Sequence, residues 1–318
     1  MKAVVFRNKK ISIEDIPLPQ PKSGEVLIKV SLAGICNTDV EISHGYMDYQ
    51  GVLGHEFVGV VEKAEQEDYI GKRVIGEINL SCGNCNWCRN GLERHCLNRD
   101  VLGILNKDGA MAEYVTLPLG NIHFLDNSIS DLQAVFTEPL AAAFEILEQI
   151  SIGEHPNVLI LGDGKLVQLI ARVVRMIHEN ILVVGKHGNK LRILQEFGIS
   201  VFKLEDFKPK LFSLVIDATG SEKGLKLAIE CTQPRGKLVL KSTVSGNYNI
   251  DLAPIVINEI SVIGSRCGPF EPALLALQNS QIKVDDLISK IYPLAQAVEA
   301  FEHAKQPEAL KILLDMRS

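Results

Sequence analysis

Hydrophobic and polar positions follow two different patterns along the chain. Up to about residue 125, apolar and polar residues alternate in short runs broken by Gly, Pro and Asn, as in residues 26–34 (VLIKVSLAG) and 51–64 (GVLGHEFVGVVEKA). Alternation with a period of two is typical of half-buried strands, and the frequent breakers keep such strands short. The pattern predicts an irregular β domain in the N-terminal part.

From about residue 155 the pattern changes to apolar runs separated by helix-like stretches. This rhythm is typical of βαβ units, in which each buried strand of a parallel sheet is followed by a crossover helix. Six runs are expected to be strands: 157–162, 181–185, 201–204, 213–220, 237–242 and 260–265. Six is the number that a doubly wound sheet of two mononucleotide-binding halves requires.

The last part of the chain, residues 266–318, shows helical periodicity. Residues 272–278 (PALLALQ), 294–304 (LAQAVEAFEHA) and 308–316 (EALKILLDM) suit amphipathic helices. We therefore expect three segments: a β domain at 1–142, a doubly wound α/β domain at 143–265, and a C-terminal segment at 266–318 that returns to the first domain.

Charge and composition exclude several classes of function. The 318 residues carry a formal net charge of −6, so the chain has no general positive field for nucleic acid or anionic lipid. The first nineteen residues alternate like a strand and show no secretory signal, and no apolar run approaches the roughly 18 residues of a membrane span. We expect a cytoplasmic protein with no nucleic-acid or membrane partner.

Four of the seven cysteines form a compact motif, Cys82, Cys85, Cys88 and Cys96, in which the spacing is C-x2-C-x2-C-x7-C. Four thiolates in a loop too short for a hydrophobic core indicate a tetrahedral zinc ion, and a closed set of four leaves no open position for substrate. The loop 82–96 is therefore expected to hold a structural zinc. Unligated thiols and an iron–sulfur cluster are the alternatives.

Two further potential ligands, Cys36 in GICNTD (34–39) and His55 in GHEF (54–57), stand alone in the sequence. An isolated buried Cys usually behaves as a small hydrophobe, and an isolated His is more often a satisfied polar residue than a ligand. Their meaning depends on the motifs around them.

Taken together, these motifs resemble the zinc-containing medium-chain dehydrogenase/reductase superfamily of alcohol, sorbitol and threonine dehydrogenases. The resemblance covers nearly the whole length and rests on GICNTD, GHEFVGVV (54–61), GKRV (71–74), the cysteine motif, FTEPLA (136–141) and LGDGKLVQLIA (161–171). It implies a GroES-like β barrel followed by a Rossmann domain. It also implies two zinc ions per chain, one catalytic and one structural, and a small alcohol or ketone substrate.

The same resemblance implies roles for residues of the first domain. Cys36 and His55 would bind the catalytic zinc, and Glu138 stands where the family places a third protein ligand, following the glutamate branch of sorbitol-dehydrogenase-like members. Glu56 would support His55 or exchange onto the metal, which leaves open which glutamate is the third ligand at rest. A surface carboxylate at a helix start is the alternative interpretation of Glu138.

The resemblance also implies a route for the proton. A cation at an open site stabilises an alkoxide, which then expels hydride. Thr38 matches the hydroxyl that carries the proton away, and Asp39 would orient the zinc ligands. One departure is Glu41, which stands where the family frequently has a relay histidine, so the route beyond Thr38 stays open, with His44 a weak substitute.

The dinucleotide site is expected at 157–174, which combine a strand, a glycine turn and an amphipathic helix. In this order the pyrophosphate meets a helix N-terminus. Gly162 and Gly164 match the first two glycines of the fingerprint, while Val167 replaces the third, so the helix must sit farther from the strand or pack around that side chain. The cofactor contacts are expected from the turn itself: Gly162, Asp163, Gly164, Lys165 and Leu166.

The end of the second strand of this half bears on the choice of cofactor. Gly185 occupies the position where NAD-specific proteins usually carry Asp or Glu, and Lys186 and His187 follow. A missing carboxylate beside a cation suits a 2′-phosphate, so NADP is favoured over NAD. Thr219, at the end of the fourth expected strand, is expected near the nicotinamide half.

Three other functions compete with a dehydrogenase. A sensor would retain dinucleotide and structural zinc without redox chemistry, a quinone or enone reductase of the same superfamily would lack the zinc ligands, and a nucleic-acid module would need a basic surface. The set Cys36, Thr38, His55 and Glu138 favours the enzyme. A homodimer or homotetramer is expected, with 260–265 as an edge strand that pairs across a dimer.

Overall fold

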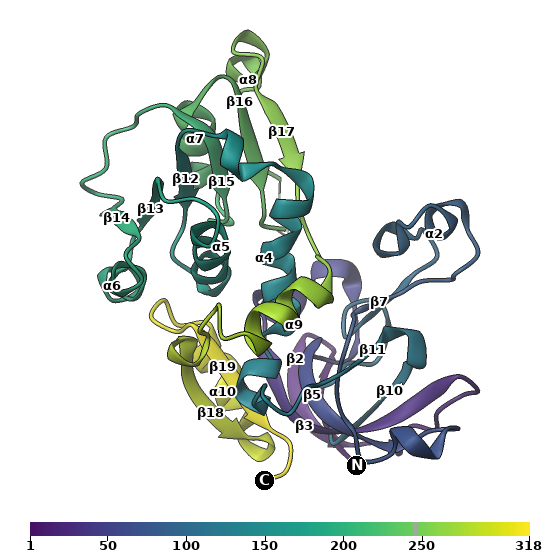
Figure 1. Ribbon diagram of the computed structural model, residues 1–318. Coiled ribbons are helices and arrows are strands. Elements are labelled where there is room, and N and C mark those ends of the chain that lie inside the picture. Colours follow the sequence, from purple (N-terminus) through teal and green to yellow (C-terminus); the bar gives the residue numbers. More distant parts are fainter. Residues whose placement is uncertain (244–246) are drawn as a thin grey trace. The chain divides into compact units, whose positions relative to one another are not determined.

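The computed structural model describes residues 1–243 and 247–318, which divide into two compact units. The first unit comprises Met1–Glu138, Leu277–Asn279 and Ile288–Ser318. The second comprises Pro139–Ala276 and Ser280–Leu287. Each unit is built around its own sheet (Figure 1).

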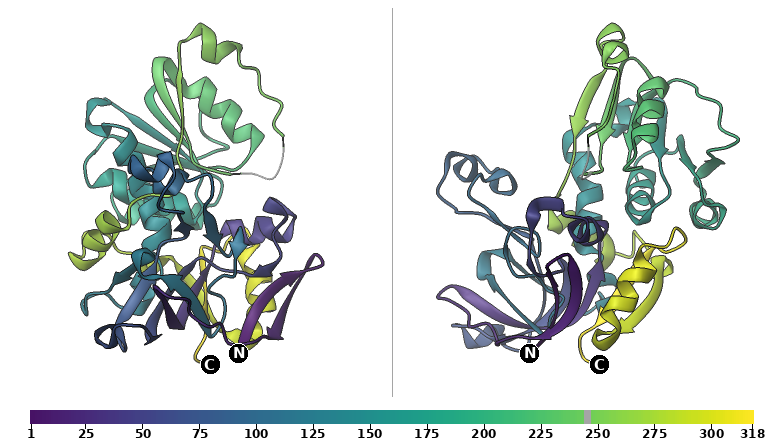
Figure 2. Two further views of the ribbon diagram at one scale, coloured as in Figure 1. Left: turned by 90° about the vertical axis from the view of Figure 1, so that its right-hand side faces the viewer. Right: turned by 180° about the vertical axis from the view of Figure 1, so that it is seen from behind.

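The first unit is a β structure built on a seven-stranded sheet of order β11-β6-β5-β3-β19-β18, with β10 also paired to β3. Its strands are β3 (Glu25–Ile35), β5 (Glu56–Lys63), β6 (Arg73–Gly76), β10 (Tyr114–Pro118), β11 (Ile122–Phe124), β18 (Ile288–Pro293) and β19 (Lys311–Asp315). The predicted strands 26–34 and 51–64 lie here, and the GroES-like β domain is confirmed. Figure 2 shows the yellow C-terminal strands beside the purple N-terminal ones.

Two smaller sheets and four short α-helices also belong to the first unit. One sheet joins β1 (Lys2–Arg7), β2 (Lys10–Asp15) and β4 (Gly51–Val52), and the other joins β7 (Asn79–Leu80), β8 (Asp100–Leu102) and β9 (Asn106–Lys107). The helices are α1 (Asn37–Ser43), α2 (Asn86–Arg89), α3 (Asp131–Ala134) and α10 (Ala297–Ala304).

The prediction of a helix at residues 308–316 is wrong, because residues 311–315 form β19, which is antiparallel to β3 and parallel to β18. Residues 311–314 are all buried, so this strand is covered on both faces. A short apolar run buried on both faces carries neither period clearly, and in this case the pairing with β3 decides its conformation. The other two predicted helices lie within α9 (Phe270–Gln278) and around α10.

The second unit contains a six-stranded parallel sheet of order β14-β13-β12-β15-β16-β17. Its strands are β12 (Val158–Leu161), β13 (Ile181–Gly185), β14 (Ser200–Lys203), β15 (Phe212–Asp217), β16 (Thr232–Leu240) and β17 (Ser261–Gly264). In chain order the arrangement is third, second, first, fourth, fifth, sixth, which is that of the dinucleotide-binding fold. The prediction of a doubly wound sheet is therefore confirmed.

Helices connect the strands of this sheet. They are α5 (Lys165–Arg175), α6 (Gly188–Glu196), α7 (Glu222–Cys231) and α8 (Ala253–Ile257); α9 follows the last strand, and the division between the units falls within α4 (Thr137–Gln149). The strands β12, β13 and β15 are buried at every position, as expected for parallel strands covered by helices on both faces. This explains why they are continuous apolar runs in the sequence.

The unit boundaries differ from the expected domain limits of 142 and 265. The first division falls at Glu138, within α4, and residues 266–276 and 280–287 group with the second unit. Arg172 of α5 holds part of this segment, because its guanidinium pairs with the Asp286 carboxylate at 2.6 Å and also donates to the Lys283 carbonyl. Among the described helices, none has the length and apolar character needed to cross a bilayer.

Candidate functional site

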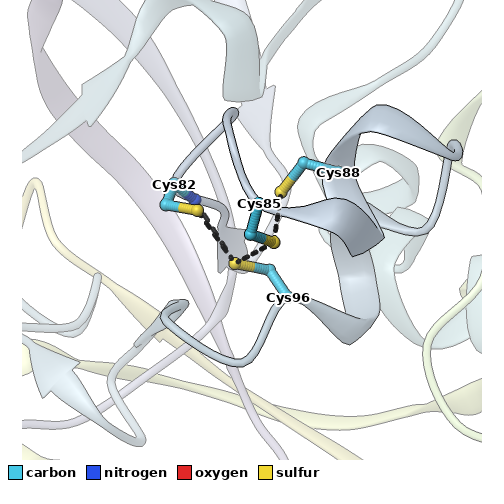
Figure 3. A group of neighbouring side chains, drawn as sticks. All are labelled: Cys82, Cys85, Cys88 and Cys96. Carbon is cyan, nitrogen blue, oxygen red and sulfur yellow. Dashed lines mark hydrogen bonds between the residues drawn. The ribbon is translucent and has the colours of Figure 1, made fainter.

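The four cysteines of the loop 82–96 converge on one point (Figure 3). The sulfur atoms of Cys85 and Cys88 are 3.5 Å apart, those of Cys85 and Cys96 are 3.7 Å apart, and those of Cys96 and Cys82 are 3.5 Å apart. Tetrahedral zinc with bonds of about 2.3 Å to sulfur requires sulfur atoms about 3.8 Å apart. The separations therefore fit a zinc ion bound by four thiolates.

Local backbone structure holds these thiols in place. Cys85 is the N-cap of α2, and Gly83 and Gly91 both have φ of 71°, a left-handed conformation that glycine adopts without strain. Hydrogen bonds from the backbone amides of Asn84 and Cys85 lower the pKa of the Cys82 thiol to about 6. The loop thus favours the thiolate, the form that binds metal, at Cys82, whereas burial raises the pKa of the Cys88 thiol to about 11.

A second group of potential ligands comes from Cys36, His55 and Glu56, whose donor atoms all lie within 4.8 Å of one another. Cys36 follows β3 and is the N-cap of α1, while His55 and Glu56 stand at the start of β5. The antiparallel register of β3 and β5 pairs Gly34 with Glu56, which brings the end of one strand next to the start of the other.

Asp39 is fully buried and contacts two members of this group, Cys36 and His55. Its carboxylate accepts hydrogen bonds from the amides of Cys36 (2.8 Å) and Gly54 (3.3 Å), and it lies 3.3 Å from Nδ1 of His55. Burial alone would lower the pKa of His55, but the charges of Asp39 and Cys36 outweigh it and hold that pKa well above its usual value. The surroundings of His55 therefore attract a positive charge, as a cation site requires.

Glu56 is a buried carboxylate of which one oxygen forms an ion pair and the other accepts no hydrogen bond from the described residues. Oε2 forms an ion pair with Nζ of Lys311, which is fully buried on β19, whereas Oε1 is buried and no described residue donates a hydrogen bond to it. A buried, unpaired carboxylate oxygen is costly unless a cation satisfies it. The group of Cys36, His55 and Glu56 thus fits a divalent metal.

Lys311 is the residue of this site that the sequence did not reveal. It lies within residues 308–316, where the periodicity predicts an amphipathic helix. Gly34 leaves space for Glu56, the partner of Lys311, because a Cβ at position 34 would come within 2.5 Å of Oε2 of Glu56. The signal that could have pointed to a buried charge is the position of this lysine among the five apolar residues of the run 309–314.

Of the two other residues expected at this site, Thr38 lies next to Cys36, whereas Glu138 lies outside the group of three ligands. Oγ1 of Thr38, in the first turn of α1, is 3.7 Å from Sγ of Cys36. Glu138 lies half-buried in the first turn of α4, and the described group with all donors within 4.8 Å does not include it. The geometry groups Glu56, rather than Glu138, with the thiol and the imidazole.

In the second unit the glycine turn has the form needed for a pyrophosphate. Gly162 follows β12 with φ of 116°, and Gly164 is the N-cap of α5, which begins with Lys165 and Leu166. The Val167 side chain is fully buried, and its Cγ2 is 3.0 Å from where a Cβ on Gly162 would lie. The helix therefore packs around this valine, and its N-terminus, the place where a pyrophosphate would bind, follows directly on the glycine turn.

Asp163, between the two glycines, contacts the end of the neighbouring strand β13. Its Oδ2 accepts hydrogen bonds from the amides of Lys186 (2.5 Å) and His187 (2.7 Å), and the His187 ring Nδ1 is 3.0 Å from both oxygens. The residues expected around the adenosine ribose are thus linked to the glycine turn. Thr219 follows β15, and its amide donates to the Asp217 carboxylate at 3.0 Å.

Together, the sheet with its glycine turn and the two ligand groups define a zinc-dependent dehydrogenase that uses a dinucleotide. Residues 22–127 match the alcohol dehydrogenase GroES-like domain, and residues 164–279 match the zinc-binding dehydrogenase family. The chain belongs to the zinc-containing medium-chain dehydrogenase superfamily and is an alcohol/polyol dehydrogenase-like enzyme that depends on zinc and NAD(P).

Full-length relatives carry several names. The chain is 28% identical to the starvation-sensing protein RspB of Escherichia coli K12, covering 99% of both chains. It is 28% identical to a sorbitol dehydrogenase of Halalkalibacterium halodurans, covering 95% of both chains. It is 31% identical to an L-threonine 3-dehydrogenase of Xanthomonas axonopodis pv. citri, covering 83% of this chain and 84% of the relative.

Solved structures show the same fold with either cofactor. A zinc-binding dehydrogenase from Sinorhizobium meliloti, bound to NADP, superposes with a TM-score of 0.90 at 25% identity over 99% of this chain and 98% of that chain. An alcohol dehydrogenase from E. coli CFT073, complexed with NADH, superposes with a TM-score of 0.89 at 28% identity over 99% of both chains.

Proposed function

We propose that the protein oxidises a secondary alcohol or polyol to the ketone, and reduces the ketone in reverse, with NADP preferred over NAD. The observation that carries this proposal is the convergence of Cys36, His55 and Glu56 around the open oxygen of a buried carboxylate. A thiolate, an imidazole and a carboxylate are a ligand set typical of catalytic zinc, which keeps a fourth position for substrate.

Cys36 and His55 are the two fixed ligands of the proposed catalytic zinc. Glu56 completes the set that the geometry favours, and Glu138, by likeness to glutamate-containing relatives, is the carboxylate that exchanges with it as substrate enters and leaves. When bound, zinc supplies a Lewis acid that eases loss of the alcohol proton or polarises the ketone. A separate, structural zinc is held by the four cysteines of the loop 82–96.

The remaining residues of the site position groups and move a proton. Thr38, beside Cys36, accepts the proton of the substrate hydroxyl and passes it outward. Asp39 fixes the ring of His55 and the amide of Cys36, so that both ligands keep one orientation. Lys311 balances the charge of Glu56, which keeps the total charge of the ligand set low.

The cofactor is bound by the second unit. Amides at the start of α5, together with Gly162, Gly164, Lys165 and Leu166, bind the pyrophosphate, and Thr219 lies at the nicotinamide half. Lys186 and His187, after a strand that ends in Gly185, favour a 2′-phosphate. The NADP-bound relative from S. meliloti supports this preference, and the NADH complex from E. coli shows that the fold accepts either cofactor.

A direct test combines turnover with metal content. Purified protein is screened against polyols, simple secondary alcohols, L-threonine and their ketones with NADP⁺ or NAD⁺, with the reduced nicotinamide followed by absorbance. We expect turnover of an alcohol, higher kcat/KM with NADP⁺, and two zinc ions per chain. One zinc ion and no turnover across the panel would indicate a sensor, and reduction of quinones without a second zinc would indicate the other branch of the superfamily.

The edge strand β17 supports a homodimer. Its partner on one side is β16, and the helix α8 before it exposes Val256 and Ile257, which are 74% and 77% exposed, next to the exposed N-cap residue Leu252. An unpaired edge beside exposed apolar side chains is suited to pairing with a second copy. Light scattering should give twice the chain mass, and Val262→Lys in β17 should yield monomers.

A further inference from the structure

Gly185 ends β13 at the position where a ribose-binding carboxylate stands in many dinucleotide-binding proteins. The space beside Gly185 is filled by the side chain of Asp163, from the glycine turn. A Cβ built on Gly185 would lie 2.6 Å from Cβ of Asp163 and 2.7 Å from its Oδ2. Real side chains do not approach so closely, so Asp163 and any side chain at position 185 exclude each other as the backbone stands.

The Asp163 side chain is fixed and faces inward. It is 7% exposed, and its carboxylate accepts the amide hydrogens of both Lys186 and His187 at the start of α6. Desolvation opposes the charge of this carboxylate, but the hydrogen bonds from His187 and the two amides hold its pKa below the usual range. The charge of the Asp163 carboxylate is thus already stabilised by hydrogen bonds from Lys186 and His187.

Two lysines and a histidine, in contrast, lie at the end of this strand. Lys186 is exposed, His187 is half-buried, and Lys203 of β14 is the register partner of Gly185. Nζ of Lys203 also lies 3.3 Å from the exposed Glu205 carboxylate, which moderates its charge. The ammonium groups of Lys186 and Lys203 are thus on exposed side chains near the end of β13, whereas the carboxylate of Asp163 is buried.

We propose that Asp163 sets the cofactor preference: it fills the space of a side chain at position 185, and it holds Lys186 and His187 in place for a 2′-phosphate. Asp163 is a positioning residue in this scheme and does not itself bind the ribose. The inference rests on the proposed use of NADP and adds that the preference is divided between two positions, 163 and 185, that must change together.

The test is a pair of single variants and their combination: Gly185→Asp, Asp163→Ala, and Asp163→Ala/Gly185→Asp. Dissociation constants for NADPH and NADH are measured by fluorescence titration without substrate, which separates binding from catalysis. We expect Gly185→Asp alone to weaken both cofactors by about tenfold or more, since two carboxylates then compete for one space. The double variant should regain NADH binding and prefer NADH over NADPH by about tenfold.

Asp163→Ala alone should weaken NADPH more than NADH, because the loop of Lys186 and His187 loses its anchor. The matched control is Asp126→Ala, which removes an exposed carboxylate that caps the Ser128 amide in the first unit and should change neither constant. Circular dichroism and thermal unfolding establish that each variant is folded.

Two outcomes would overturn the inference. If Gly185→Asp alone gained NADH affinity, the space would be free, and if Asp163→Ala left the ratio of the two constants unchanged, the loop would not depend on Asp163. Either result leaves the proposed dehydrogenase standing, as long as the unmodified protein binds a cofactor. Failure of the unmodified protein to bind both cofactors would instead overturn the proposed function and this inference together.

Discussion

The two candidate zinc sites differ in how far apart in the chain their components lie. All four ligands of the structural site come from the loop 82–96, and glycine turns and backbone amides of that loop hold them. The proposed catalytic site takes Cys36 from the end of one strand, His55 from the start of another, and Lys311 from a third strand 255 residues after Glu56. The first site depends on local geometry, and the second depends on the whole sheet.

This difference has an energetic consequence. A closed set of thiolates gains its free energy from metal binding and from ordering one loop, so its contribution is mainly to stability. The second site also contains a buried carboxylate and a buried ammonium, which are stable only as a pair. Perturbing the two sites should therefore separate loss of activity from loss of stability.

The largest difference between the loss of activity and the loss of stability is expected from Cys36→Ala. Removing the thiolate should release one of two zinc ions and lower kcat/KM by about a thousandfold, corresponding to about 4 kcal/mol, because the Lewis acid is lost. The thermal midpoint should shift by only a few degrees (~3 °C), because the loop 82–96 and both sheets remain intact. Metal analysis, kinetics and a thermal melt check these points, and a large drop in the midpoint would contradict the assignment.

A slightly smaller effect is expected from Lys311→Met. The methionine fills the space, but the Glu56 carboxylate is left buried without its partner, which should lower the free energy of unfolding by about 3 kcal/mol. Denaturant unfolding measures this loss. The control is the double variant Lys311→Met/Glu56→Gln, which should recover part of the stability, and equal losses in the single and double variants would show that the pair is not coupled.

Cys96→Ser should give the opposite result to Cys36→Ala. The fully buried Cys96 is within hydrogen-bonding distance of two other sulfur atoms, so its loss should empty the structural site and cost about 2 kcal/mol of stability. Catalytic efficiency should remain within about fivefold of the unmodified protein, since the other ligands are untouched. A loss of activity as large as that of Cys36→Ala would mean that the sites are interdependent.

The smallest effect in this series is expected from Asp39→Asn. The amide can still accept from Cys36 or Gly54 but no longer offers a charge to His55, so zinc affinity at the catalytic site should fall by about tenfold. Competition with a chromophoric chelator measures this affinity for each of the two ions. The structural ion should be unaffected, and equal weakening of both ions would show that Asp39 acts through the fold rather than through His55.

Much of this organisation could be predicted from the sequence because its signals are local. The cysteine spacing, the six apolar runs and the glycine turn each occupy a short window in which physical chemistry allows few alternatives. Cys36 and His55 were weak signals when taken singly and became informative only through their neighbours. The GroES-like and dinucleotide-binding folds were both confirmed on this basis.

What the sequence did not reveal arises from contacts between distant segments. Residues 311–315 form a strand because β3 and β18 offer pairing on both sides, which no local pattern shows. The importance of Lys311 follows from that pairing. Likewise, Gly185 looked like the loss of a carboxylate, and only the packing of Asp163, 22 positions earlier, shows what fills its place.

The dependence of Glu56 on Lys311 also bears on how the protein is made. During synthesis the loop 82–96 has all four of its ligands once Cys96 has emerged, so it can take up zinc early. The carboxylate of Glu56 must wait for a strand translated 255 residues later before its charge is balanced. The charge balance of the proposed catalytic site is therefore complete only when the C-terminal strand has joined the sheet, whereas the four thiols of the loop 82–96 need no residue from beyond Cys96.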